Sequence, residues 1–404
     1  MRQMRFGTAL LVVLFAVVGC GSDDDGAGEP TIAVGVLAPL DAGLTQFGRG
    51  IRNSVQLAVD QAAEADLLPG WQLEVVAVDD SSDPDVGSIN AQRLLDESNL
   101  IGVVGTYNSG VAAAVAPAFA AAGLALISPG NTDPSLTLGP DRDNPMRPHE
   151  NYFRMVAHDA QQGGFLARAA TDLGFSAVAI VSDEKQVSQG LANDFRTAFV
   201  AAGGTILSFE IVPEGDIDYV PYAQRAAATS PELLFFGGEY DHAALLKQAA
   251  FAAGLAVPLM GGDGIQANDY IAAAGANAEG DLASSVGVAV ESEPGGPAFA
   301  AAYAAAGFVD PPSTFGPYAY DAANLLLSTA RDALAGRTRV DDAVRADIIE
   351  RVQAATNATL INASGAVTGE IGFDEFGDTI HPVLTVYRVE DGEWVPLAAA
   401  SGVR

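Results

Sequence analysis

The chain has almost no cysteine and almost no lysine. Cys20 is the only cysteine among 404 residues, so the rest of the sequence offers no disulfide, no cysteine nucleophile and no cysteine metal ligand. The lysines are Lys185 and Lys247 alone, in a chain whose formal net charge at pH 7 is −31. Nucleic-acid binding requires basic patches, and anionic lipid attracts basic segments. This composition therefore argues against a disulfide scaffold, against a nucleic-acid partner and against electrostatic docking on membranes.

The motifs of common catalytic and cofactor sites are also missing. The four histidines are scattered, without metal-ligand spacing. The sequence has no dinucleotide-binding glycine loop after a strand, no phosphate loop and no G-x-S-x-G elbow. The stretch Asp79–Asp83 resembles the start of a calcium loop but lacks its glycine and distal glutamate. We interpret it as a polar turn that caps a helix starting near Asp85, and we predict neither an enzyme nor a metal or cofactor site.

The first residues have the pattern of a secretory signal. Arg2 and Arg5 precede an apolar stretch, Phe6–Val18, which is too short to span a bilayer comfortably and ends in Gly19-Cys20. A cysteine directly after a small residue at this place resembles the bacterial lipoprotein signal, in which the thiol is lipidated. We predict a signal peptide over 1–19, lipidation at Cys20 and a location on the outer face of the cytoplasmic membrane. An uncleaved anchor that happens to end in cysteine is the alternative.

The segment 20–30 contains GSDDDGAGEP, which has no apolar residue large enough to pack, and we expect it to be a flexible tether. After it, short apolar runs alternate with amphipathic helical stretches, the pattern of α/β proteins. About 370 residues are more than one hydrophobic core usually serves. The strand and helix pattern also restarts after a loop rich in proline and charge at 138–150. We predict an α/β fold with two doubly wound lobes of parallel sheet.

The expected elements follow from these runs. Strands are expected at 31–40, 73–78, 101–105, 124–128, 177–182, 205–212, 233–237, 257–260 and 383–389, the last paired with a strand around Trp394. Helices are expected at 48–65, 85–97, 111–122, 161–173, 189–202, 243–253, 297–306, 320–335 and 340–354.

Polar turns stand at the carboxyl ends of three expected strands, where open α/β sheets bind ligands. Gly105–Ser109 and Ser128–Thr132 offer hydroxyls and backbone N–H groups beside a helix start, which suits a carboxylate. Gly261–Gly264 presents Asp263 on a flexible, glycine-rich loop, which suits an ammonium group. Taken singly, Ser109 is most simply a helix cap and Asp263 a turn former.

In their order along the chain these turns resemble those of the branched-chain amino-acid-binding (Leu/Ile/Val-binding) proteins of bacterial ABC importers, which have the type I periplasmic binding protein fold. The matching segments extend over the whole mature chain. They are Val34–Leu40, Thr45–Gly48, Asp79-Asp80, Asp83-Pro84, Gly105–Ser109, Ser128–Thr132, Pro134, Phe153-Arg154, Asp159, Gln162-Gly163, Asp183–Ala192, Gly237-Gly238, Gly261–Gly264, Tyr320-Asp321-Ala322, Phe373-Asp374 and Gly377-Asp378.

The resemblance implies two lobes that are joined by three hinge crossings and close on a ligand. The crossings are expected near 157–159, near 283–287 and around 377–380. Lobe one is then formed by 31–157 and 286–378, and lobe two by 158–285 and 379–404. Together, 31–404 form one Leu/Ile/Val-binding-like domain.

The same resemblance assigns the ligand contacts. Ser109 and the turn at Gly130, Asn131 and Thr132 are expected to contact the carboxylate and the amino group of an amino acid. Asp263 takes the place of the acidic residue that pairs with the ligand ammonium from lobe two. Phe47 takes the place of an aromatic residue at the cleft mouth, and Phe315 that of an aromatic side-chain contact.

Two departures from the family pattern concern the side-chain pocket. Val187 stands where the family often has tyrosine, and Glu239, followed by Tyr240, stands where an aromatic residue often follows the Gly237-Gly238 pair. We therefore expect the amino-acid backbone to be recognised and the side-chain pocket to be altered. A Glu239 that faces the cleft suits a polar or cationic ligand. The alternative is that Glu239 faces solvent while Tyr240 packs.

The sequence thus predicts a monomeric, lipid-anchored binding protein that delivers an amino acid, branched-chain or otherwise aliphatic, to an ABC permease in the membrane. A binder of small amides or urea-like solutes for the same kind of importer is an alternative. A sensory receptor ectodomain without transport is another. An enzyme is disfavoured because no nucleophile–base pair is evident.

Overall fold

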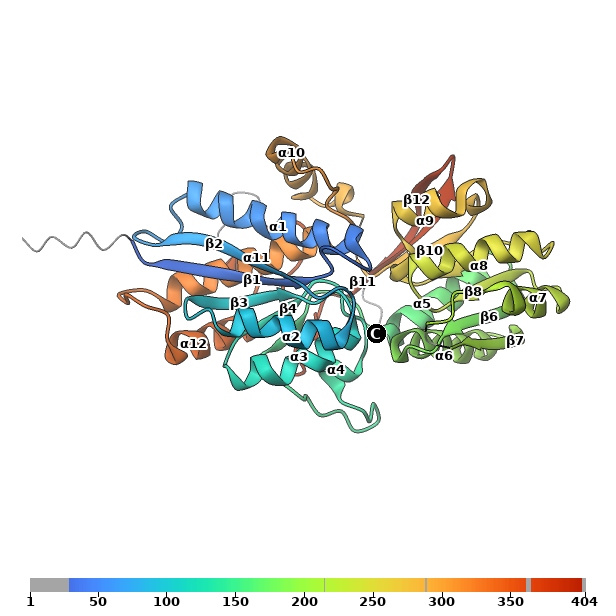
Figure 1. The fold of residues 1–404 in the computed structure, drawn as a ribbon, viewed down its shortest axis with the longest axis horizontal. Helices are drawn as coiled ribbons and strands as arrows, with labels where there is room; N and C mark the ends of the chain where they lie inside the picture. The colour runs from blue at the N-terminus through green and yellow to red at the C-terminus, as the bar shows by residue number, and fades with distance from the viewer. Residues whose placement is uncertain (1–28, 214, 288, 361–364, 402–404) are drawn as a thin grey trace, which may run out of the picture.

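Two separate β-sheets organise the chain, and Figure 1 shows them at opposite ends of an elongated molecule. The structure, a computed structural model, describes residues 29–213, 215–287, 289–360 and 365–401. The expected signal peptide, Cys20 and most of the expected tether lie outside these residues. Across the described part of the chain, no helix combines the length and the apolar character that crossing a bilayer requires.

Sheet one has the strand order β2-β1-β3-β4-β5, with all neighbouring strands parallel. Its strands are β1 (Thr31–Ala38), β2 (Gln72–Asp79), β3 (Leu100–Gly105), β4 (Leu126–Ser128) and β5 (Tyr152–Arg154). The order reverses between β1 and β3, which makes this the point where a doubly wound sheet opens a crevice at its carboxyl edge.

Sheet two repeats this order and then extends it, as β12-β11-β10-β9-β8-β6-β7. Its parallel strands are β6 (Ala177–Asp183), β7 (Thr205–Val212), β8 (Leu233–Phe236), β9 (Leu259–Gly261) and β10 (Leu282–Ser285). An antiparallel pair, β11 (Val383–Glu390) and β12 (Glu393–Ser401), continues the sheet beyond β10. The chain therefore contains the same winding twice.

Helices cover both faces of sheet one. On one face lie α1 (Thr45–Glu64) and α11 (Gly316–Ala333), and on the other α2 (Pro84–Leu95) and α3 (Ser109–Ala121). Successive β1 side chains alternate between these layers: Val34 and Val36 belong to the core that contains α1, and Leu37 to the core that contains α3. The apolar run at 31–38 is thus a strand buried on both faces.

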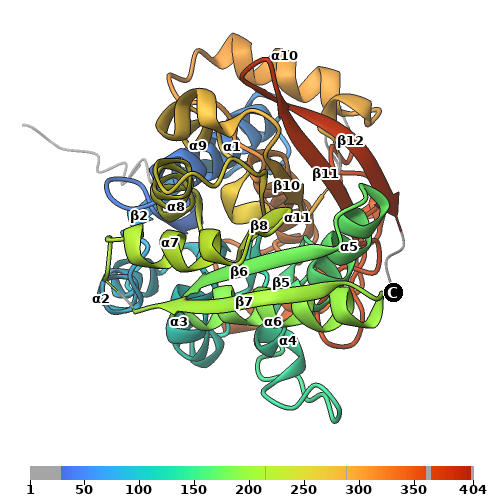
Figure 2. The ribbon, with the colours of Figure 1, turned by 90° about the vertical axis from the view of Figure 1, so that its right-hand side faces the viewer.

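Sheet two is covered in the same way. Figure 2 shows α5 (Asp159–Asp172) and α6 (Gln186–Ala201) on one side of its strands, and α7 (Val220–Ala228) and α8 (Tyr240–Ala252) on the other. The remaining helices are α4 (Ser135–Leu138), α9 (Asn268–Ala274), α10 (Gly296–Ala306) and α12 (Asp342–Gln353), with short 3-10 turns η1 (Asp263–Ile265), η2 (Gly275–Ala278), η3 (Val290–Ser292) and η4 (Asn357–Thr359).

The expected strands and helices are present, with ends displaced by a few residues. Besides the 3-10 turns, five α-helices and strands of the described residues are unpredicted: α4, β5, α7, α9 and β10. Each is short, and β10 reads Leu-Ala-Ser-Ser, so half of a fully buried strand is polar. Periodicity over so few residues does not separate such a strand from a loop.

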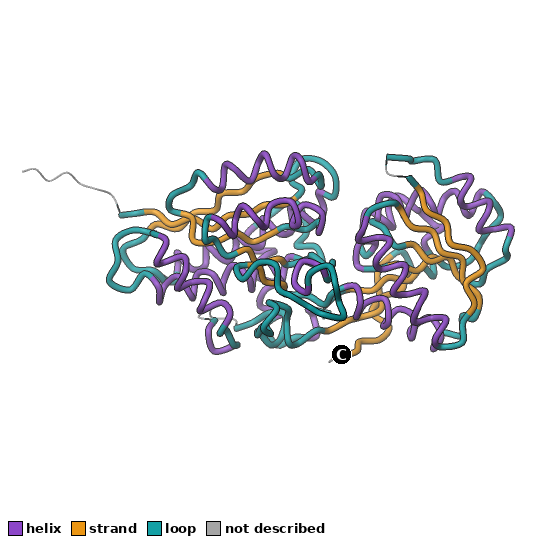
Figure 3. The backbone as a smooth tube through the Cα atoms, turned by 90° about the horizontal axis from the view of Figure 1, so that it is seen from below, coloured by secondary structure: helices purple, strands orange, loops and turns teal. Residues whose placement is uncertain are grey.

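The chain passes between the two sheets three times: after β5, after β10, and between Asp378 and β11. Figure 3 shows two bodies of helices and strands that meet in a narrow region. Arg154 at the end of β5 is fully buried, and its Nε and Nη2 atoms lie 2.8 and 2.6 Å from Asp378 Oδ1. This ion pair fixes the start of the third passage against sheet one. The predicted fold class is confirmed, and we propose the lobe boundaries given above from these passages.

Candidate ligand-binding site

The carboxyl ends of strands from both sheets face a common cavity of about 380 Å³. Lobe one contributes the turns after β3 and β4, and lobe two contributes the turns after β6, β8 and β9. The turns after β3, β4 and β9 are the three polar turns that the sequence indicates, brought together from both halves of the chain. Ser109, Gly130, Thr132, Val187, Glu239 and Asp263 all line this cavity.

On the lobe-one side, Ser109 links two of these turns. It is the first residue of α3, and its Oγ accepts hydrogen bonds from the backbone N–H groups of Thr132 and Asp133, both at 3.2 Å. The helix cap itself is Asn108, so the simple reading of Ser109 as a cap is wrong. The hydroxyl and the positive end of α3 thus face the cavity together, where a carboxylate is favoured.

Asn131 lies behind this wall rather than in it. Its Nδ2 donates to the Tyr107 carbonyl oxygen at 2.7 Å, and the Tyr152 hydroxyl donates to its Oδ1 at 2.9 Å. The side chain is completely buried and does not line the cavity. Asn131 therefore holds the turn after β4 in place, and its predicted ligand contact is not supported by its position.

On the lobe-two side, Asp263 begins η1 and is 6% exposed. Gln162 Nε2 donates to Asp263 Oδ1 at 2.9 Å, and the Asp263 N–H donates back to Gln162 Oε1 at 2.9 Å. A Cβ on Gly262 would lie 2.5 Å from Gln162 Oε1, so the glycine allows close packing. The Asp263 loop, which the sequence predicts to be flexible, is therefore held in place by its hydrogen bonds to Gln162. Burial raises the pKa of Asp263 to about 6.

Asp159 is a second acidic residue in the cavity wall. It is one of the residues that resemble the family, but no ligand contact is predicted for it from the sequence. It begins α5, lines the cavity and is 1% exposed. Apart from the nearby Thr132 hydroxyl, its two carboxyl oxygens have no hydrogen-bond donor among the described residues. Burial, together with the Asp263 carboxyl, raises its pKa well above the ordinary value. A cation bound here would favour the ionised form of both the Asp159 and the Asp263 carboxyl groups.

Glu239 faces the cavity, which answers the question that the sequence left open. It precedes α8, and its side chain is 16% exposed. Its Oε2 lies 2.6 Å from Lys185 Nζ, and its Oε1 accepts a hydrogen bond from Asn108 Nδ2 at 2.6 Å. Asn108 belongs to lobe one, so Glu239 connects the two lobes across the cavity.

The expected aromatic contacts are arranged differently. Phe47, Tyr107, Tyr240 and Phe315 form one cluster, with ring centroids 4.7 to 5.4 Å apart. Only Tyr107 of these four lines the cavity. Phe47 instead lines a wider opening of about 850 Å³ next to α10. Because the rings pack on one another, Phe47, Tyr240 and Phe315 lie outside the cavity wall where the resemblance places ligand contacts.

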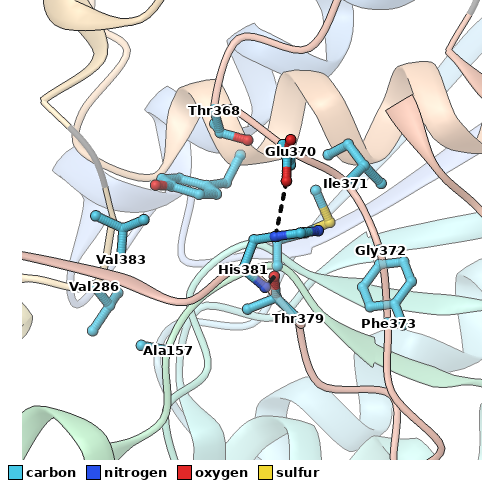
Figure 4. A pocket seen from close by; sticks show the side chains of 12 residues that line it. Ala157, Val286, Thr368, Glu370, Ile371, Gly372, Phe373, Thr379, His381 and Val383 are labelled. Atoms are coloured by element: carbon cyan, nitrogen blue, oxygen red, sulfur yellow. Dashed lines mark hydrogen bonds and ion pairs between the residues drawn. The ribbon is translucent and has the colours of Figure 1, made fainter. Parts of the chain in front are cut away.

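A small cavity of about 10 Å³ lies at the hinge, lined by residues from all three passages. Figure 4 shows His381 pointing towards Glu370 there, with His381 Nδ1 3.1 Å from Glu370 Oε2. This volume holds about one water molecule. The hinge cavity is therefore part of the packing between the lobes and cannot admit a solute.

Residues 31–393 match the family described as periplasmic binding protein. The chain belongs to this family. One relative is the "Leucine-, isoleucine-, valine-, threonine-, and alanine-binding protein" of Pseudomonas aeruginosa. It is 27% identical to this periplasmic binding protein over an alignment that covers 95% of this chain and 97% of the relative. A Brucella melitensis "Leu/Ile/Val-binding protein homolog 3" is 28% identical over 67% of this chain and 70% of its own.

Solved structures agree. The branched-chain amino acid transporter substrate-binding protein LivJ of Streptococcus pneumoniae, in complex with isoleucine, has a TM-score of 0.78 and 26% identity, and covers 92% of this binding protein and 99% of its own chain. A solute-binding protein from R. palustris in complex with benzoate shares the fold, with a TM-score of 0.76 at 21% identity, over 92% and 97% of the two chains. The predicted relationship to branched-chain amino-acid-binding proteins of ABC importers is confirmed.

Proposed function

We propose that this chain is the extracytoplasmic solute-binding subunit of an ABC importer and that its cargo is an amino acid. One observation carries the proposal: a single cavity has Ser109 and Thr132 beside the start of α3 on one side and the buried Asp263 carboxyl on the other, with the buried Asp159 carboxyl close to both Thr132 and Asp263. The first side suits a carboxylate and the second an ammonium group. Every free α-amino acid carries both groups on one carbon atom.

The division of the contacts between lobes supports a role in closure. A ligand that touches Ser109 in lobe one and Asp263 in lobe two stabilises only the form in which both are near it. Contacts between the lobes are already built around the cavity, such as Gln186 Nε2, which donates to Asp133 Oδ2 at 3.3 Å. The names of the similar proteins, which include amino-acid-binding subunits of transporters, support the same class of cargo.

The direct test is calorimetric titration with free amino acids and with the corresponding amides. Binding of at least one amino acid, and loss of binding when its carboxylate is converted to an amide, is the expected result. An uncharged amide or urea as the tightest ligand would contradict the amino-acid assignment and favour the alternative class. Chemical turnover of any bound compound would contradict a purely binding role.

We also propose that Cys20 anchors the protein to the membrane through lipid. The supporting features are the apolar segment before Cys20 and the acidic, glycine-containing segment after it. In cell fractionation, Cys20→Ser is expected to move the protein from the membrane fraction to the soluble fraction, with ligand affinity unchanged. If the variant stays with washed membranes, the lipoprotein assignment fails.

A further inference from the structure

The cavity contains a second polar site, next to the groups that we propose to bind the carboxylate and the ammonium group on the α-carbon (the head) of an amino acid. The head itself does not need this second site. Its centre is Glu239, whose carboxylate is held by Lys185 and by Asn108. A carboxylate has about four acceptor sites on its two oxygens, so both oxygens can accept further hydrogen bonds. An added Cβ on Gly264 would lie 3.5 Å from Glu239 Cγ, which places Glu239 directly beside the Asp263 loop.

An unpaired acceptor stands beside Glu239. Asn108 uses its Nδ2 group to donate to Glu239, while its Oδ1 is buried without a hydrogen-bond partner among the described residues. Asn108 also lines the cavity. A buried acceptor without a partner costs free energy that a ligand donor can recover. Two acceptors side by side, one of them charged, match a group that carries several N–H donors.

The charges around the cavity favour a cation over an anion at this place. Among the described residues, the lining has five carboxyl side chains and a single positively charged one, Lys185. The charge of Glu239 is the largest influence on Lys185 and raises its pKa, and Asp183 and Asp241 act in the same direction. An anionic ligand group that approached Lys185 would therefore enter among three carboxylates.

The apolar part of the wall is made by the Tyr107 ring and by a few small or aliphatic side chains. The rings of Phe47, Tyr240 and Phe315 pack together away from the cavity, so they offer no apolar surface to a branched side chain. Val111, Val187 and Leu191 do line the cavity. These residues can cover a short methylene chain, whose far end then needs a polar partner.

We propose that the cargo is an amino acid whose side chain ends in an ammonium or guanidinium group, and that Glu239 and Asn108 bind that end. This inference rests on the proposed function, because it assumes that Ser109, Thr132 and Asp263 hold the amino-acid head. Glu239 is then the residue that determines specificity. The cargo differs from the aliphatic amino acid that the sequence predicts.

Matched pairs of amino acids test this inference. Lysine and norleucine share one carbon chain and differ by the terminal ammonium group, as do ornithine and norvaline. In calorimetric titration of the full chain, we expect the cationic member of at least one pair to bind about tenfold more tightly or better, as charge-assisted hydrogen bonds in a cavity allow. We expect Glu239→Gln to reduce that preference to about threefold or less.

Two control variants separate binding from folding. Glu350→Gln changes the net charge equally at an exposed position on α12 and is expected to leave the preference intact. Glu239→Asp keeps the charge and is expected to retain part of the preference, and a thermal melt of each variant shows whether it folds. A preference that survives Glu239→Gln would overturn the role of Glu239.

The outcomes distinguish this inference from the proposed function. If norleucine, norvaline or isoleucine binds as tightly as lysine and ornithine, the cationic cargo is wrong, and the amino-acid function stands. If no amino acid binds, arginine included, both fail. If cadaverine, which is lysine without its carboxylate, binds as tightly as lysine, the carboxylate contact at Ser109 fails and the amino-acid assignment with it.

Discussion

The two lysines of this chain each pair with a carboxylate, but in opposite environments. Lys247 Nζ lies 2.5 Å from Asp281 Oδ1 in the core of lobe two, and Asp281 also accepts from the Leu259 N–H at 2.6 Å and the Tyr270 hydroxyl at 2.5 Å. Lys185 pairs with Glu239 at the wall of a cavity, beside Asn108 Oδ1, an acceptor that has no partner within the described part of the chain. The first site is saturated by the protein and can only hold the fold together. The second retains hydrogen-bonding capacity, which is what a ligand requires.

The largest expected effect separates the two lysines by stability. Lys247→Met leaves the buried Asp281 without its counter-charge and is expected to lower the free energy of unfolding by about 3–5 kcal/mol. Lys185→Met removes a partly exposed partner and is expected to cost about 1 kcal/mol or less. Urea titrations of both variants measure the difference. Equal losses would show that the cavity pair is as structural as the core pair.

Two aspartates extend the comparison to binding. Asp263→Asn is expected to weaken amino-acid binding by about 30-fold to several thousand-fold, because a buried ammonium loses its charged acceptor. Its stability without ligand is expected to hold, since the asparagine keeps the shape of the side chain and removes a buried charge. Asp281→Asn is expected to do the reverse, with lower stability and unchanged affinity in the protein that remains folded. Calorimetry and thermal melts on the two variants provide the measurements.

Acid is expected to act in opposite directions on stability and on binding. Burial raises the pKa of Asp263 to about 6, above the value of about 3.9 for an aspartate in the unfolded chain. The stability contribution of such a group is full below the unfolded pKa and is lost as pH rises through 6. The unliganded protein should therefore gain stability from pH 7 to pH 4.5.

Ligand affinity should fall over the same range, because the ammonium group requires ionised Asp263. Below pH 6, each further unit is expected to weaken binding by up to about tenfold until the pKa of the bound state is reached. Titrations between pH 4.5 and 8, compared with melts at the same pH values, test both trends. An affinity that is constant with pH would remove Asp263 from the ammonium site.

The smallest effect concerns the other end of the amino acid. Ser109→Ala removes the acceptor of two backbone N–H groups but leaves those groups free to donate to a ligand carboxylate. The expected loss in binding is about 1 kcal/mol, or fivefold. A loss in calorimetry as large as that of Asp263→Asn would mean that the hydroxyl itself carries the carboxylate contact.

What the sequence predicts well depends on near neighbours in the chain. The turn before α2 is an example: Asp83 Oδ1 accepts from the N–H groups of Asp85 and Val86, at 2.8 and 3.0 Å, as expected for a helix cap in place of a calcium loop. The polar turns after β3, β4 and β9 are also where the alternation of strand and helix places them. Position relative to a strand end is a local property, so the pattern contains it.

What the sequence does not predict depends on side chains that meet from distant parts of the chain. Glu239 meets Asn108 across the two lobes, and Asp159 meets Asp263 only after β9 and α5 are assembled. The mutual packing of Phe47 and Tyr240 likewise joins the lobes, and it removes both rings from the cavity wall. No spacing along the sequence encodes these contacts.

The Tyr320-Asp321-Ala322 segment illustrates a motif whose role is structural. Asp321 is completely buried, and it accepts from the N–H groups of Val367 and Thr368 and from the Thr368 hydroxyl. The Asp321 carboxylate therefore fixes the loop at 367–368, which precedes the third passage, against helix α11. This segment therefore resembles the family because it stabilises the shared fold, and it does not line the ligand cavity.

Because three segments of the chain connect the two lobes, few relative movements of the lobes remain easy. Parallel connections resist sliding and twisting, so rotation about a common axis is the soft movement. Under the proposed import function, the binding of a cargo would be expressed as a single angle between the lobes, and a membrane partner that touched both lobes would sense that angle without contacting the cargo. Arg142 on the loop after α4 and Asp194 on α6, whose atoms lie 2.9 Å apart across the lobes, add an ion pair at the angle that the structure has.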